Sequence, residues 1–208
     1  LFLKFTIMQK LPLSFYSRKN VLVIAKDLIG KVLIHHNGKA LTAGRIVETE
    51  AYDGVIDRAS HAYGGRRTAR NEIMYAEAGT AYVYICYGMH HLFNVVTNRK
   101  DIPHAILIRA LEPLQGLDLM LKRRKKKKPD HLVTRGPGSL SVAMGITVKQ
   151  NGHSLISDDL YIADDDVRIP SKAIAVSHRI GVESSREAAV YPYRFYVKGN
   201  PFVSGHPR

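Results

Sequence analysis

The sequence predicts a single α+β domain whose sheet is mainly antiparallel. Its 208 residues suit one domain with a substantial core. A β-branched segment, residues 31–35, is followed by the turn-forming pair Asn37-Gly38 and by residues 41–52, where apolar and polar side chains alternate. This order is the pattern of a β-hairpin. Residues 20–30, with apolar side chains at helical spacing, precede the hairpin, so a helix and antiparallel strands are expected in one chain.

Residues 20–30 are expected to form one amphipathic helix. Asn20 is suited to cap its N-terminus, because the side-chain oxygen can accept hydrogen bonds from the first free backbone amides. Gly30 is suited to the left-handed conformation that commonly ends a helix. We therefore expect Asn20 as the N-cap and Gly30 as the C-cap.

In the strand over residues 41–52, successive side chains point to opposite faces of the sheet. The alternation predicts one face with Ile46, Glu48, Glu50 and Tyr52. The opposite face is predicted to carry Val47, Thr49 and Ala51. Two carboxylates and a phenol would then share one side of the strand.

The next part of the chain predicts a long loop and a second hairpin. Residues 53–79 are rich in Gly, Arg and Ala without sustained periodicity, which is typical of a structured loop. Two strand-like segments follow over residues 80–87 and 90–98, with Gly88 between them. This arrangement places Tyr87 at or near the tip of a hairpin.

Residues 105–111 predict an apolar strand that only Arg109 interrupts. A guanidinium inside such a strand needs a carboxylate or phosphate partner, so Arg109 is a candidate functional residue. From Glu112 onward the sequence looks helical and ends in the basic tract, residues 122–128 (KRRKKKK). We interpret the tract as a solvated helix end or loop in preference to a specific contact.

The C-terminal part predicts fewer elements. The Gly-rich turn over residues 135–139 precedes an apolar, helix-like segment up to Ile146. It lacks the GxxxxGK spacing of a P-loop, so the sequence does not support nucleotide hydrolysis. A last strand is expected over residues 193–198.

Charge indicates a polyanionic partner. The sequence has 31 Lys and Arg against 18 Asp and Glu, a net charge of +13 with a pI near 9.9. Without the seven charges of the basic tract the chain would still carry 13 − 7 = +6. Nucleic acid is therefore favoured over an anionic membrane, since the tract lacks an adjoining aromatic face that could enter lipid.

Cysteine and histidine content argues against a metal or other cofactor. The single cysteine, Cys86, cannot form an intramolecular disulfide or a Cys-rich metal site, and it indicates a reducing compartment. His90 and His91 are adjacent, so on a strand they would face opposite ways. We expect no cofactor, no metal and no membrane partner, and a location in the cytoplasm or nucleoid of a bacterium or the nucleus of a eukaryote.

Residues 1–10 are expected to be an extension outside the fold, with the domain spanning residues 11–208. The apolar start, residues 1–7, is too short for a membrane span and lacks a cleavage pattern. Met8 is a candidate for the natural start.

Several residues match the needs of an enzyme that acts on a base in duplex DNA, which must first be rotated out of the stack. Planar faces for a purine could come from Tyr52, His61 and Tyr84, and a wedge from Tyr87. Glu50 and Arg109 could position and deprotonate a water. The candidate contacts to the DNA backbone are Arg66, Arg67, Arg70 and Met89. Taken singly, each has a plainer interpretation: strand tyrosines usually pack in cores, and a lone histidine is usually structural.

Five segments resemble, in order, the motif blocks of the alkyladenine (3-methyladenine) DNA glycosylase family. They are GRIVETEAYDG (44–54), SHAYGGRRTARNEIMY (60–75), GTAYVYICYGMHHLFNVV (79–96), ILIRALEPLQG (106–116) and RGPGSLSVAMGI (135–146). The flanking segments RIGV (179–182) and YRFYVKGNPFVS (193–204) also look like that family. The resemblance runs from about Leu11 to about Ser204. It implies a curved sheet, surrounding helices and a protruding hairpin that intercalates into DNA.

The resemblance also implies roles for individual residues. Glu50 matches the general base that activates the attacking water, and Arg109 matches the arginine that helps to hold this water. Tyr52, His61 and Tyr84 match the residues that enclose the flipped base. Asn94 matches the asparagine that disfavours the 2-amino group of guanine. Tyr87 matches the intercalating tyrosine.

The implied activity is removal of alkylated, and also deaminated or etheno, purines from duplex DNA by a monomeric, monofunctional glycosylase that leaves an abasic site. Ser139 departs from the lysine that relatives commonly carry, which puts one phosphate contact in doubt; the basic tract could compensate. The alternative is a non-catalytic nucleic-acid-binding module in which Glu50 is incidental.

Overall fold

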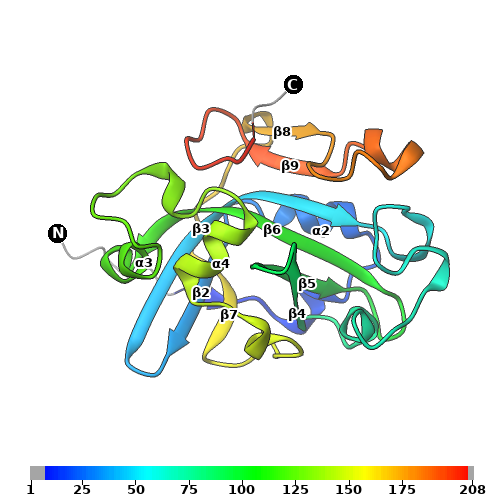
Figure 1. The fold of residues 1–208 in the computed structure, drawn as a ribbon, viewed down its shortest axis with the longest axis horizontal. Coiled ribbons are helices and arrows are strands. Elements are labelled where there is room, and N and C mark those ends of the chain that lie inside the picture. Colours follow the sequence, from blue (N-terminus) through cyan, green and yellow to red (C-terminus); the bar gives the residue numbers. More distant parts are fainter. Residues whose placement is uncertain (1–7, 206–208) are drawn as a thin grey trace.

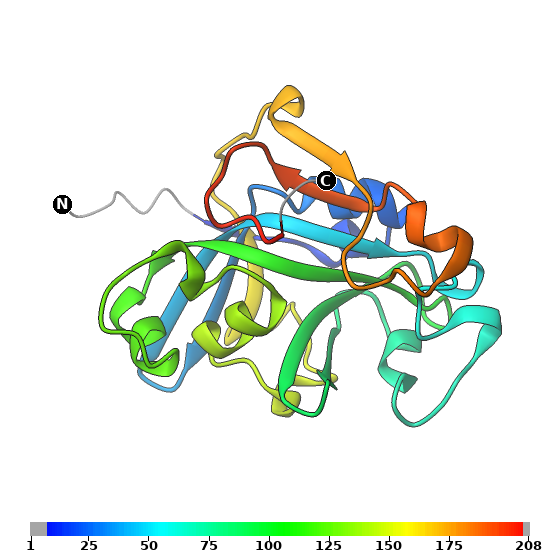
Figure 2. The ribbon, with the colours of Figure 1, turned by 45° about the horizontal axis from the view of Figure 1, so that its top comes forward.

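A mainly antiparallel sheet organises the computed structural model, which describes residues 8–205 (Figure 1). Within these residues the strands are β1 (Gln9–Lys10), β2 (Val32–Asn37), β3 (Ala40–Tyr52), β4 (Ala81–Cys86), β5 (His90–Thr97), β6 (His104–Gln115), β7 (Leu160–Asp164), β8 (Ile174–Ser177) and β9 (Arg194–Val197). Seven of them pair in the order β1-β7-β2-β3-β6-β5-β4. β9 pairs with both β3 and β8, and Figure 2 shows this orange and red pair beside β3. The predicted α+β class is confirmed.

Short helices surround the sheet. The α-helices are α1 (Leu13–Tyr16), α2 (Val21–Asp27), α3 (Leu117–Arg123) and α4 (Pro137–Met144). The 3₁₀ turns are η1 (Gly54–Ile56), η2 (Tyr63–Gly65), η3 (Glu72–Tyr75), η4 (His131–Val133), η5 (Val148–Gln150), η6 (Ser171–Ala173) and η7 (Arg186–Val190). Residues 53–79 thus form the expected loop, with three of these turns. No helix within residues 8–205 combines the length and apolarity needed to cross a bilayer.

Helix α2 begins as predicted but ends earlier than expected. The Asn20 side chain accepts hydrogen bonds from the amides of Leu22 (3.0 Å) and Val23 (3.1 Å). The C-cap is Leu28, so the prediction of Gly30 at this position is wrong. Gly30 has φ +90° and lies beyond the helix end, where its amide donates to the Ile46 carbonyl at 2.8 Å and leads the chain toward the sheet.

A β-bulge in β3 corrects the predicted alternation. The pairing of β3 with β6 shifts between Ile46 and Glu48. As a result Ile46 packs in the main core cluster with Ala51, whereas Val47 packs in a small cluster with Ala110 and Val203. The expectation that Ile46 shares a face with Glu48 is therefore wrong, because the extra residue of a bulge reverses the side chains on one side of it.

The strand that contains Arg109 is longer than predicted. β6 continues to Gln115 because residues 112–115 pair with the first half of β3. The helix expected from Glu112 starts only at Leu117, after Gly116 turns the chain with φ +75°. The basic tract forms the end of α3 and the loop after it, as predicted.

The predicted boundary of the N-terminal extension is also corrected. Gln9 and Lys10 pair with Asp164 and Ala163 of β7, so they belong to the sheet. Residues 1–7 of the predicted extension lie outside the described residues. Neither β7 nor β8 was predicted, and both are short strands without a long alternating pattern.

The second hairpin agrees with the sequence. β4 and β5 pair antiparallel from Ala81 opposite Val95 to Cys86 opposite His90. Residues 87–89 connect the two strands, with Gly88 at φ +72°. An intercalating role for this hairpin stays a prediction.

Candidate active site

Strands β3 and β6 bring two carboxylates and a guanidinium together in the protein interior. Arg109 of β6 lies beside β3, with its Nε 3.0 Å from a Glu48 oxygen and its Nη1 3.2 Å from a Glu50 oxygen. Both glutamates are fully buried, and Arg109 is nearly so. Burial acts to lower the pKa of Arg109, but the charges of Glu50 and Glu48 outweigh it and raise the pKa. The arginine that interrupts the apolar strand therefore has two carboxylate partners, as its burial requires.

Four hydrogen bonds hold the Glu48 carboxylate. It accepts from Arg194 Nε of β9 at 2.7 Å, from the Ser204 amide at 2.6 Å and from the Ser204 hydroxyl at 3.0 Å, in addition to Arg109. Arg194 is also buried. We call Glu48, Glu50, Arg109 and Arg194 the charge cluster. Its two positive and two negative groups balance, which limits the cost of burying them.

Glu50 has a different set of partners. Besides Arg109, it accepts hydrogen bonds from the Tyr52 hydroxyl (3.0 Å) and the Ile180 amide (2.8 Å). Burial, and then the charge of Glu50, raise the pKa of Tyr52 well above its usual value, so Tyr52 stays a phenol that donates to the carboxylate. A carboxylate can accept about four hydrogen bonds. With two hydrogen bonds and the ion pair with Arg109, Glu50 still has acceptor capacity.

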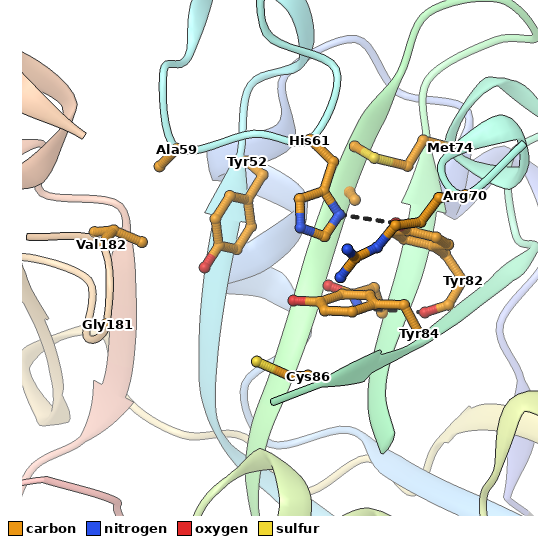
Figure 3. Close-up of a pocket in the computed structure, with 12 residues that line it drawn as sticks. Tyr52, Ala59, His61, Arg70, Met74, Tyr82, Tyr84, Cys86, Gly181 and Val182 are labelled. Carbon is orange, nitrogen blue, oxygen red and sulfur yellow. Dashed lines mark hydrogen bonds between the residues drawn. The ribbon is translucent and has the colours of Figure 1, made fainter. Parts of the chain in front are cut away.

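An aromatic cavity of about 180 Å³ opens beside Tyr52, the residue whose hydroxyl donates to Glu50 (Figure 3). Its lining includes Tyr52, His61, Arg70, Tyr82, Tyr84, Cys86, Asn94 and Gly181. The structure thus brings together the three residues predicted to enclose a base and Asn94, the residue predicted to disfavour guanine. An adjoining hollow of about 340 Å³ shares Tyr52 and Tyr84 with the cavity and reaches Arg109, Tyr87 and residues 136–139 at the start of α4.

The rings on one side of the cavity contact each other. The centroids of His61 and Tyr84 are 4.6 Å apart, and the His61 Nδ1 lies 2.8 Å from the Tyr82 hydroxyl. Burial, and then the charges of Arg70 and Arg66, lower the pKa of His61. Asn94 is fixed by donating its side-chain amide to the Tyr82 and Leu92 carbonyls at 3.1 and 3.2 Å. These contacts order the cavity wall before any ligand enters.

Arg179 supports Tyr52 from outside the cavity. Its guanidinium lies 4.7 Å from the centre of the Tyr52 ring, donates to the Ala51 carbonyl at 2.8 Å and forms a buried ion pair with Asp57. The sequence placed Arg179 in a family-like segment without a role. These three partners lie more than 120 residues away in the chain, so no local pattern could identify them.

The hairpin tip carries exposed apolar side chains. Tyr87 is 85% exposed and Met89 is 71% exposed. Tyr87 also has φ +50°, in the left-handed region that residues other than glycine seldom adopt. Such strain is tolerated only where the surrounding turn determines it. The structure therefore presents the predicted wedge residue to solvent at the edge of the adjoining hollow.

The three loop arginines differ in their surroundings. Arg67 forms ion pairs with Glu72 at 2.6 Å and Asp101 at 2.8 Å, so its charge is already compensated. Arg66 is exposed. Arg70 lines the aromatic cavity. For the part of the chain between residues 8 and 205, no group of three or more His, Cys, Asp or Glu side chains is arranged to hold a metal ion.

Comparison with known proteins agrees with this geometry. Residues 14–201 match the family model described as methylpurine-DNA glycosylase. Proteins named "Putative 3-methyladenine DNA glycosylase" are similar along most of their length. One from Clostridium perfringens (strain 13 / Type A) is 44% identical over 94% of this chain and 98% of its own. Those from Chlamydia abortus (strain DSM 27085 / S26/3) and Desulfitobacterium hafniense (strain Y51) are 47% and 43% identical, covering 90% and 95% of this chain and 97% and 99% of theirs.

Proposed function

The chain belongs to the methylpurine-DNA glycosylase family, and from this premise we propose that it is a DNA repair enzyme that hydrolyses the N-glycosidic bond of a damaged purine in duplex DNA. The observation that carries the proposal is Glu50, a buried carboxylate that pairs with Arg109 and accepts a hydrogen bond from Tyr52, which lines the aromatic cavity. Activation of a water nucleophile requires a group near the reacting bond that can accept a proton, and a carboxylate is such a group.

In the proposed reaction, Glu50 accepts a proton from a water whose oxygen attacks C1′ of the deoxyribose. The bond between C1′ and the base nitrogen breaks, and its electron pair leaves with the purine. Arg109 fixes the Glu50 carboxylate and, from the wall of the adjoining hollow, helps to hold the water. Because the nucleophile is water, the product is an abasic site and the strand is not cut.

The damaged purine enters the aromatic cavity after leaving the base stack. His61 and Tyr84 are in contact with each other, which leaves no room for a base between them. The base is therefore held between this pair and Tyr52, which lie on opposite sides of the cavity in Figure 3. The π-faces attract the positive charge of an alkylated purine. Asn94 disfavours the 2-amino group of guanine.

The exposed elements contact the duplex. Tyr87 fills the space that the flipped base leaves, and Met89 lies against the backbone beside it. Arg66, Arg67 and the basic tract supply positive charge near phosphates, which positions the duplex without reading its sequence, whereas Arg70 lines the cavity. The protein acts as a monomer.

The test is single-turnover base release from duplexes with one hypoxanthine, one ethenoadenine or 3-methyladenine. Glu50→Gln is expected to slow release by roughly 10²- to 10⁴-fold, because it removes the general base, while binding to damaged duplex is retained. Glu77→Gln is the matched control, since Glu77 is exposed on the loop, and it should leave release unchanged. Tight duplex binding by the intact protein without release of any of the three bases would favour the non-catalytic binding module.

A further inference from the structure

Arg70 differs from the other loop arginines in where its guanidinium lies. It reaches strand β4, where Nη2 donates to the Ile85 carbonyl at 3.3 Å and the guanidinium carbon is 5.8 Å from the centre of the Tyr84 ring. Arg70 lines the aromatic cavity, and Figure 3 shows its guanidinium near His61 and Tyr84. The guanidinium of Arg67, in the same loop, instead forms ion pairs with Glu72 and Asp101.

Most of the Arg70 donors are free for a ligand. A guanidinium has five N–H donors in a planar fork. Only the hydrogen bond to Ile85 uses one of them among the described residues, and none of their ion pairs involves Arg70. The positive field reaches the cavity wall, since after burial Arg70 is the largest cause that lowers the pKa of His61. A base in the cavity therefore meets a charged group with several unused donors.

We propose that Arg70 is a specificity-determining residue, whose guanidinium reads the O6 and N7 acceptors of a flipped 6-oxopurine such as hypoxanthine. This inference rests on the proposed function. The two acceptors lie on one edge of the base and match the guanidinium fork, as they do when arginine binds guanine in the major groove. A 6-aminopurine presents an amino donor at the same place, so one donor would face another.

Charge adds to this discrimination. A cationic base such as 3-methyladenine is attracted by the aromatic faces but repelled by Arg70, whereas neutral hypoxanthine meets no such repulsion. Release of a deaminated purine therefore depends on Arg70, and release of a cationic alkylated purine depends on the rings. The same cavity then serves both classes through different contacts.

The experiment measures single-turnover release of hypoxanthine from a defined duplex and of 3-methyladenine from methylated duplex DNA. In Arg70→Gln, the ratio of the hypoxanthine rate to the 3-methyladenine rate is expected to fall by about 5- to 100-fold, the size of one bidentate base contact. Affinity for undamaged duplex should stay unchanged. Arg70→Lys, which keeps the charge but lacks the fork, should also slow hypoxanthine release while still disfavouring the cationic base.

Arg66→Gln is the matched control, because Arg66 belongs to the same loop but not to the described residues that line the cavity. It should leave the ratio unchanged. An equal loss for both bases in Arg70→Gln, with weaker binding and a flatter salt dependence on undamaged duplex, would identify a phosphate contact and overturn the inference. An unchanged ratio would also overturn it. Failure of the proposed function would appear differently, as release of neither base by the intact protein.

Discussion

The polar groups of the charge cluster on β3, β6 and β9 differ in burial and pairing from those on the rim of the aromatic cavity. In the cluster, Glu48 and Glu50 are inaccessible to solvent and every charged group has a partner of opposite charge. The rim consists of residues 53–79 and the turn over residues 87–89. There Tyr87 and Met89 are exposed, and Arg70 uses one donor on a carbonyl. Strands thus hold the groups that must not move, and loops present groups whose partners arrive with a ligand.

The two glutamates show the same contrast on a smaller scale. Glu48 accepts four hydrogen bonds, from two guanidiniums, an amide and a hydroxyl. Glu50, two residues later on the same strand, accepts two hydrogen bonds and pairs with Arg109, and its donor Tyr52 lines the cavity. A carboxylate held by four hydrogen bonds serves to fix its neighbours, whereas one with fewer donors can take part in a reaction. Glu48 therefore fixes Arg109, and Arg109 in turn fixes Glu50.

The largest effect on stability should follow from Glu48→Ala. It leaves Arg109 and Arg194 buried without their shared partner, which typically costs about 3–5 kcal/mol. Glu72→Ala on the rim removes an exposed partner of Arg67 and should leave stability almost unchanged, because solvent screens the pair. Urea unfolding of both variants measures the difference. An equal loss of unfolding free energy in both variants would mean that the buried ion pairs of the cluster contribute no more to stability than the exposed pair on the rim.

Local patterns in the sequence predicted much of the fold. The Asn20 cap, the turn at Gly38 and the hairpin over β4 and β5 depend on neighbouring residues, and the structure contains all three. The bulge at Val47 was missed because it depends on how β6 pairs with β3 rather than on the β3 sequence. The short strands β7 and β8 were missed for a similar reason, since their pairing partners lie far away in the chain.

The candidate site shows the same division. Arg109 stood out because a charge within an apolar strand needs a partner, and the family resemblance placed Glu50, Tyr52, His61, Tyr84 and Asn94 around one cavity. Neither argument could reveal that Glu48 accepts hydrogen bonds from Arg194 and Ser204. The hydrogen bond from Arg70 to β4 also depends on the path of an irregular loop, and that loop has no sequence periodicity from which the contact could be predicted.

A smaller effect, confined to the rim, is expected from Tyr87→Ser. Stacking of an aromatic side chain on a base is worth roughly 1–3 kcal/mol, so preference for damaged over undamaged duplex should fall about 5- to 100-fold. Tyr87 neutralises no phosphate, so affinity for undamaged duplex and its salt dependence should not change. Folding stability should stay within about 0.5 kcal/mol. Titrations of both duplexes at several salt concentrations test this, with Tyr63→Ser as an exposed aromatic control; weaker binding to both duplexes would contradict the wedge.

The smallest effect concerns pH and His61, the titratable ring of the cavity wall. Burial, and then the charges of Arg70 and Arg66, lower its pKa in the folded protein, while the unfolded chain regains the ordinary value of about 6.5. Below that pH the unfolded state binds a proton that the folded state does not, so stability falls as the solution is acidified. Burial also lowers the pKa of His35 and His104, which adds a loss of stability on acidification that is common to all variants.

Urea unfolding at pH 8 and pH 5.5 should therefore show a smaller loss of unfolding free energy for His61→Asn than for the intact protein. Arg70→Gln should lie between them, because it removes one cause of the lowered pKa and leaves burial in place; an unchanged loss in both variants would mean that His61 does not carry this pH dependence.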